Sequence, residues 1–228
     1  LCMPVKIYRG DYLLKSLLML AAAGLLAWGG RGGEVGLSLS LPLVGVFVVF
    51  TYENLRSARR AMRCGADLGP VRTSPRRRTA LFQCMKFTLG AAAVVLGADL
   101  LVDSGSALAR LAGISERIIG VTIVAVGTSL PELVTTVTAI VKKQSALSVG
   151  NILGANILDL TLILPLSALL SGQALPVSAA SARIDIPACL LVGTIAVVPA
   201  MAAARFRRWQ GAALLAVYGG YLALTCCA

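Results

Sequence analysis

The chain has 228 residues, of which 57% are apolar and only 14% are charged, and its mean hydropathy is +0.85. Soluble domains carry about a quarter charged residues, so this composition excludes an ordinary water-soluble globule. The 21 Lys and Arg outnumber the 10 Asp and Glu, and histidine is absent, which excludes Ser-His-Asp hydrolases and HExxH metalloproteases. We therefore expect an integral membrane protein that is not an enzyme.

Seven stretches nearly free of charge are long enough to cross a bilayer core of about 30 Å. In chain order they cover residues 12–29, 36–54, 80–102, 118–141, 145–170, 185–203 and 209–226. Between the second and the third lies an arginine-rich segment with several Gly and Pro residues, and we interpret residues 56–79 as a basic cytoplasmic linker. The pattern predicts an all-α polytopic membrane protein with about seven transmembrane helices.

The basic residues predict the orientation of these helices. When the loops are assigned alternately to the two sides of the membrane, 17 of the 21 Lys and Arg fall on one side. Cytoplasmic loops collect Lys and Arg, so we expect the chain to start in the cytoplasm and to end outside. Anionic lipid next to these loops explains the positive charge, and no nucleic-acid partner is needed.

The fourth stretch carries a carboxylate deep in the membrane. Glu132 lies 15 residues after Arg117 and 10 before Lys142, which is about 22 Å and 15 Å along a helix. A carboxylate at the bilayer centre costs about 2.5–3.5 kcal/mol, so it needs a partner, and no Lys or Arg inside the span supplies one. A bound cation fits this role. A protonated Glu132 on a proline-kinked packing helix stays open as the alternative.

Gly127 and Pro131 predict a break in this helix, since proline removes a backbone donor and glycine lets the chain open. Such a break frees carbonyl oxygens at mid-membrane, where they are tolerated only if they line a cavity or coordinate something. Thr128 and Ser129 add hydroxyl oxygens next to those carbonyls. Oxygen donors with a carboxylate suit hard cations such as Ca²⁺ and Na⁺.

The fifth stretch holds a second carboxylate of this kind. Asp159 lies 16 residues beyond Lys143, about 24 Å along a helix. Gly150 and Gly154 permit close approach of a neighbouring helix, and we expect Asn156 to bond backbone groups that the broken fourth stretch leaves free. Together, Glu132 and Asp159 would match the charge of one Ca²⁺.

These motifs resemble the second alpha repeat of the cation/Ca²⁺ antiporter superfamily, the sodium/calcium exchanger family. The resemblance covers about residues 97–170 and rests on three segments: Gly97-Ala98-Asp99-Leu100-Leu101-Val102, Gly127-Thr128-Ser129-Leu130-Pro131-Glu132-Leu133 and Gly150-Asn151-Ile152-Leu153-Gly154-Ala155-Asn156-Ile157. It implies a ten-helix inverted-repeat exchanger fold, of which this chain holds about seven helices.

The resemblance also implies roles for individual residues. Glu132 would be the shared Ca²⁺/Na⁺ ligand, and Thr128 and Ser129 would give backbone and hydroxyl oxygens to Na⁺. Asp159 stands where the family has an ion-facing Asp or Asn. Ala155 stands where the family usually has serine, which removes one hydroxyl and leaves the Na⁺ stoichiometry open.

The implied domain organisation has three parts. Residues 1–55 hold two helices that end the first half, residues 56–79 form the linker, and residues 80–228 form the second five-helix half. Family members have one Gly-Thr-Ser-x-Pro-Glu-like segment in each half, and this chain contains one. We therefore expect the first repeat to lie upstream of Leu1.

The implied function is secondary active transport, in which Ca²⁺ is exchanged for Na⁺ across the cell membrane by alternating access. No cofactor is expected beyond the transported ions, and membrane lipid is an expected partner. Two alternatives stay open: coupling to H⁺ or K⁺, and a truncated, transport-inactive half that works with a first-half chain or as a homo-oligomer. The sequence also leaves the direction of transport open.

Overall fold

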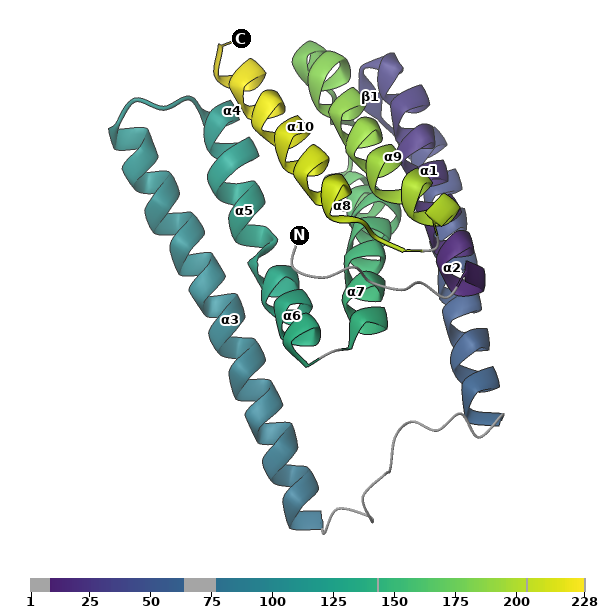
Figure 1. Cartoon of the computed structure of the whole chain (residues 1–228). Helices are drawn as coiled ribbons and strands as arrows, with labels where there is room; N and C mark the ends of the chain where they lie inside the picture. Colours follow the sequence, from purple (N-terminus) through teal and green to yellow (C-terminus); the bar gives the residue numbers. More distant parts are fainter. Residues whose placement is uncertain (1–8, 64–76, 143, 204, 228) are drawn as a thin grey trace. The chain divides into compact units, whose positions relative to one another are not determined.

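The computed structural model describes residues 9–63, 77–142, 144–203 and 205–227, which are almost entirely helical (Figure 1). The longer helices are α1 (Arg9–Gly29), α2 (Leu37–Arg63), α3 (Arg77–Leu111), α6 (Leu130–Val141), α7 (Ser145–Leu158), α9 (Ile186–Ala203) and α10 (Arg208–Cys227). The shorter helical segments are η1 (Gly30–Gly32), α4 (Glu116–Ile119), η2 (Gly120–Val124), α5 (Ala125–Thr128), η3 (Asp159–Ile163), α8 (Leu164–Leu170) and η4 (Ser181–Asp185). Two short strands, β1 (Glu34–Val35) and β2 (Leu175–Pro176), pair antiparallel.

Five helical stretches are long and apolar enough to cross a membrane: Tyr12–Gly32, Leu37–Arg60, Leu81–Leu111, Leu147–Leu170 and Ser181–Ala203. The pair Glu116–Thr128 and Leu130–Val141, bent by 42°, counts as a sixth if it forms one span. These six coincide with six of the seven predicted spans. The seventh is α10, which is about 30 Å long but is not among the candidates found in the described residues. The all-α, multi-pass architecture is thereby confirmed.

Two helices run further than the sequence pattern predicted. α2 includes residues 56–63 of the predicted linker, and α3 has 35 residues, about 52 Å, and ends at Leu111 rather than near residue 102. Arginine, alanine and leucine are good helix formers, so a membrane span can end at a charge while the helix continues. The rest of the linker up to α3, residues 64–76, lies outside the described residues.

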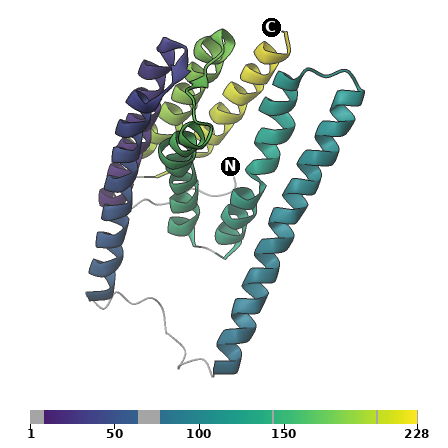
Figure 2. The same ribbon diagram turned by 180° about the vertical axis from the view of Figure 1, so that it is seen from behind.

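One compact unit combines the residues up to Glu53 with those from Thr135 onward. In this unit α1 packs against α9 and α7, and α9 packs against α10 (Figure 2). Its buried apolar side chains form two small clusters, one of Tyr12, Met19, Leu153, Ile157, Val197 and Ala200 and the other of Ala22, Val35, Leu39 and Leu43. Many large apolar side chains stay exposed, as expected for helices that face lipid.

The other compact unit, Asn54–Val134, is built mainly as a helical hairpin in which α3 packs against α4, η2 and α5. Glycines allow a close approach in this hairpin. A Cβ atom at Gly105 would lie 3.1 Å from Ile123 Cγ2, and one at Gly127 would lie 2.1 Å from Val102 Cγ2. Since a β-branched valine has little rotamer freedom in a helix, glycine at 127 is what lets α3 and α5 meet.

The boundaries of the compact units fall inside α2 and α6 rather than in the predicted linker. The predicted division into residues 1–55, 56–79 and 80–228 follows the two halves of an inverted repeat, whereas the compact units follow spatial packing. The predicted division therefore stays a prediction.

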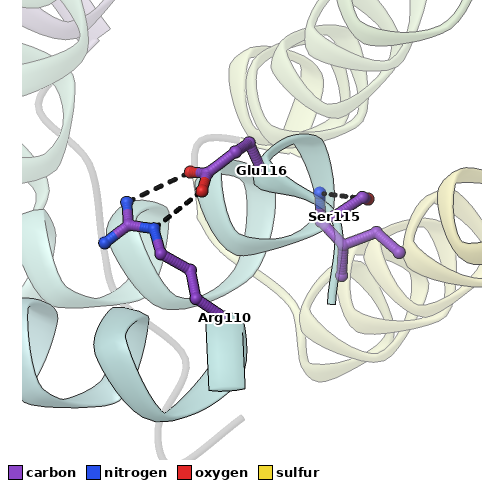
Figure 3. A network of polar contacts seen from close by, with 4 residues as sticks. Arg110, Ser115 and Glu116 are labelled. Carbon is purple, nitrogen blue, oxygen red and sulfur yellow. Dashed lines mark hydrogen bonds and ion pairs between the residues drawn. The ribbon is translucent and has the colours of Figure 1, made fainter. Parts of the chain in front are cut away.

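Polar contacts fix the turn between α3 and α4. Arg110 donates from Nε to Glu116 Oε1 at 2.7 Å and from Nη2 to Oε2 at 3.1 Å (Figure 3). Ser115 caps α4, because its Oγ accepts a hydrogen bond from the amide of Ile118. Gly113 has φ of +76°, a conformation that favours glycine. Because the Arg110–Glu116 ion pair is exposed, it adds little to the stability of the fold, and its main effect is to hold the turn in this conformation.

Candidate ion-binding site

The broken helix predicted around Gly127 and Pro131 is present. α5 ends at Thr128, α6 begins at Leu130, and the two helices are bent by 42° at Ser129, whose φ and ψ are −89° and −2°. Pro131 has no amide hydrogen, so it cannot make the helical bond to the carbonyl of Gly127, four residues earlier. The prediction of a break is confirmed.

Partial charges at the break favour a cation on one side and a carboxylate on the other. The stretch Glu116–Thr128 ends here, and the carbonyl end of a helix carries a partial negative charge of about half an elementary charge. Glu132 lies in the first turn of α6, where the positive end of that helix stabilises an anion. Glu132 is half-buried, and its Oε2 is shielded from solvent.

The two hydroxyl residues at the break are exposed. Thr128 Oγ1 donates into its own helix, to the carbonyl oxygens of Val124 at 2.9 Å and Ala125 at 3.3 Å. Because Thr128 donates its hydroxyl hydrogen to its own helix, the lone pairs of Oγ1 remain able to coordinate a cation. Thr128, Ser129 and Glu132 therefore gather hydroxyl, carbonyl and carboxylate oxygens within five consecutive residues.

Asp159 belongs to the compact unit that contains the residues from Thr135 onward. It is the first residue of η3, where α7 (Ser145–Leu158) widens into a π-helical turn, and its side chain is exposed. Among the described residues, no group of three or more Cys, Asp or Glu side chains could hold a metal ion. Hard cations also bind hydroxyl and carbonyl oxygens together with carboxylates, which is the donor set present at the break.

Each of the two predicted spans that carry a candidate carboxylate contains a π-helical turn that the sequence pattern did not predict: η2 lies before the break in the span of Glu132, and η3 begins at Asp159. Thr122 in η2 donates its hydroxyl hydrogen to the carbonyl of Ile118, and Thr161 in η3 donates to that of Ile157 at 2.6 Å. A threonine that bonds back by four residues tends to bend a helix, and π turns concentrate at functional sites. A threonine inside an apolar span is the only signal in the sequence.

Asn156 makes a hydrogen bond within its own helix: its Nδ2 donates to the carbonyl of Ile152 at 2.8 Å. Its predicted bond to the broken fourth stretch, which belongs to the other compact unit, stays a prediction. Asn151, five residues earlier on α7, reaches α6. Its Nδ2 donates to Thr135 Oγ1 at 2.8 Å and to Thr136 Oγ1 at 3.2 Å.

A multi-pass helical protein with a broken span and oxygen donors at the break has the architecture of a secondary transporter. The family model described as "Sodium/calcium exchanger protein" matches residues 84–226, and the chain belongs to this family. The expectation drawn from the alpha-repeat motifs is thereby confirmed.

Relatives match over shorter stretches. The chain is 37% identical over 134 residues to Sodium/calcium exchanger MaX1 of Methanosarcina acetivorans, covering 59% of this chain and 38% of that protein. It is 48% identical over 58 residues to Sodium/potassium/calcium exchanger 2 of Homo sapiens, covering 25% of this chain and 9% of that protein. The chain thus spans well under half the length of these relatives.

Solved structures confirm the fold. The sodium-calcium exchanger NCX_Mj aligns with a TM-score of 0.71 at 23% identity, covering 96% of this chain and 67% of that structure. The H⁺/Ca²⁺ exchanger CAX aligns with a TM-score of 0.66 at 15% identity, covering 98% of this chain and 60% of that structure. Both are exchangers, and at these identities they show that the chain has an exchanger fold.

Proposed function

We propose that the protein is a secondary active antiporter that exchanges Ca²⁺ for Na⁺ across the cell membrane by alternating access. The observation that carries the proposal is the break at Ser129, which gathers carbonyl, hydroxyl and carboxylate oxygens in a chain of the sodium/calcium exchanger family. The ion ligands are Glu132, Asp159, Thr128 and Ser129. The protein uses no cofactor other than the transported ions.

Charge balance supports this set of ligands. A carboxylate at the bilayer centre costs about 2.5–3.5 kcal/mol, and a bound cation offsets that cost. Two carboxylates neutralise one Ca²⁺, and hydroxyl and carbonyl oxygens complete a shell that also suits Na⁺. Because both ions need Glu132, one must leave before the other binds. This competition couples the two fluxes.

The central test is Ca²⁺ uptake by proteoliposomes that contain Glu132→Gln. We expect uptake to fall to the level of empty vesicles. The uncharged amide cannot neutralise the positive charge of a bound cation, so neither Ca²⁺ nor Na⁺ keeps its shared ligand. The matched control is Glu34→Gln, at an exposed carboxylate in β1, which should leave uptake unchanged. Wild-type uptake by the Glu132→Gln protein would overturn the assignment.

The same vesicles identify the counter-ion. Outward gradients of Na⁺, H⁺ and K⁺ are imposed in turn, since MaX1 is named for sodium, exchanger 2 for sodium and potassium, and CAX for H⁺. We expect Na⁺ to drive uptake. Uptake driven by H⁺ alone, or uptake that requires K⁺ as well, would replace Na⁺ coupling by one of the alternatives.

A further inference from the structure

One interhelical polar contact lies beside the proposed ion ligands without belonging to them. We call it the Asn151 bridge: Asn151 on α7 donates through Nδ2 to Oγ1 of Thr135, at 2.8 Å, and to Oγ1 of Thr136, at 3.2 Å, both on α6. Thr136 is buried and Asn151 is half-buried. The bridge joins residues 15 and 16 positions apart, from two different helices.

The chemistry of the bridge uses the full donor capacity of the amide. An asparagine NH₂ group carries two hydrogens, and two adjacent threonine hydroxyls accept one each. Two acceptors at successive positions of α6 lie about 100° apart around the helix, so bonding both fixes the rotation of α6 about its axis as well as its distance from α7. A single bond would fix only the distance.

Glu132 lies on the same helix, three residues before Thr135 and four before Thr136. Residues at these spacings lie one turn apart on one helix face. The rotation that the bridge sets is therefore also the rotation that sets the direction of the Glu132 carboxylate.

We propose that Asn151 is a positioning residue: through Thr135 and Thr136 it holds α6 in the rotation at which Glu132 binds the cation. The proposal rests on the proposed function. Asn151 does not need to touch the ion, and its removal acts on the apparent affinity for Ca²⁺ rather than on the maximal rate per folded molecule.

The test uses isosteric substitutions that remove only hydrogen-bonding groups. Asn151→Leu removes the donors, the Thr135→Val/Thr136→Val pair removes the acceptors, and the triple variant removes both. Thr135→Ser/Thr136→Ser keeps both hydroxyls and is the conservative variant. Thr138→Val removes a hydroxyl from an exposed position of the same helix and is the matched control.

Two quantities are measured on each purified protein: the melting temperature in detergent, and the Ca²⁺ dependence of initial uptake normalised to folded protein. We expect Asn151→Leu and the valine pair each to weaken the apparent Ca²⁺ affinity about three- to twenty-fold, the range that corresponds to an interhelical hydrogen bond in a membrane. The triple variant should be no weaker than either, and the serine pair and Thr138→Val should match wild type.

Three results overturn the inference. In the first, the effects of Asn151→Leu and of the valine pair add in the triple variant, which means that these residues act independently. In the second, only the melting temperature and the folded yield fall while the apparent affinity stays constant, which leaves a purely structural contact. In the third, the serine pair weakens the apparent affinity as much as the valine pair does, so the hydroxyl groups are not the cause.

If wild-type protein takes up no Ca²⁺, the proposed function fails, and the positioning role for cation binding fails with it. The melting temperatures then decide only whether the bridge exists.

Discussion

At the scale of single residues, Gln210 shows how a proline inside a helix is accommodated. Pro199 lies within α9 and has no amide hydrogen for the carbonyl of Ile195, four residues earlier. The buried side chain of Gln210 supplies the donor, from Nε2 to the Ile195 oxygen at 3.3 Å and to that of Ala196 at 3.5 Å. Its Oε1 accepts from the amide of Arg207 at 2.7 Å, just before α10 begins. The side chain of Gln210 thus bonds both the carbonyl group that Pro199 leaves without its helical donor and the amide of Arg207, which precedes α10.

We predict that Gln210→Leu destabilises the protein by about 1–3 kcal/mol, the cost of leaving a buried polar group without a partner. In a Pro199→Ala background the loss should be smaller, because the substituted alanine restores an amide hydrogen for the Ile195 carbonyl. The measurement is the unfolding midpoint in detergent, with the exposed Gln173→Leu as the control. Equal losses in the two backgrounds would contradict the link between Gln210 and Pro199.

At the scale of elements, the contact of α3 with α5 depends on the absence of one carbon atom. A Cβ at Gly127 would lie 2.1 Å from Val102 Cγ2, closer than any real contact. Gly127 also directly precedes Thr128, so a displacement of α3 or α5 at this point acts on the break itself. Packing and the proposed ion site therefore meet at the same glycine.

Gly127→Ala should destabilise the protein by about 1–3 kcal/mol through overpacking. Adding Val102→Ala, which removes the obstructing methyl group, should recover most of that loss. Gly120→Ala in the preceding π turn is the control. A Cβ there meets nothing within 4 Å, and we expect it to be neutral or to stabilise by about 0.4–1 kcal/mol. Thermal unfolding of the four proteins checks the series. If Val102→Ala brings no recovery, the clash is not the cause.

What the sequence could predict at this scale depended on whether the cause was local. Pro131 and Gly127 act on their own backbone, so the break was predictable, and so was the position of Glu132 in the following helix. The charge pattern predicts a span that ends near residue 54, whereas α2 continues to Arg63, because arginine ends an apolar span but favours a helix. The Asn151 bridge was missed because its partners come from another helix, and only tertiary packing decides whether Asn151 or Asn156 reaches it.

At the scale of the whole molecule, the bent pair of helices decides the topology. Glu116–Thr128 and Leu130–Val141 form either one broken span or a re-entrant loop. Their 25 residues of helix give about 37 Å along the two axes, and a 42° bend leaves enough to cross a core of about 30 Å. The charge pattern agrees, since 17 of the 21 Lys and Arg fall on one side only if this pair crosses once.

This topology predicts that Ser115, before α4, and Gln144, before α7, face opposite sides of the membrane. Both side chains are exposed, so Ser115→Cys and Gln144→Cys can be labelled singly in a background whose six native cysteines are replaced by serine. In intact cells a membrane-impermeant maleimide should label the Ser115→Cys protein but not the Gln144→Cys protein, and permeabilised cells should label both. The cysteine-free protein without either new cysteine is the control.

Labelling of both positions from outside would instead make the pair of helices Glu116–Thr128 and Leu130–Val141 a re-entrant loop. The loops that follow would then change sides, and the 17-to-4 distribution of basic residues that orients the rest of the chain would be lost.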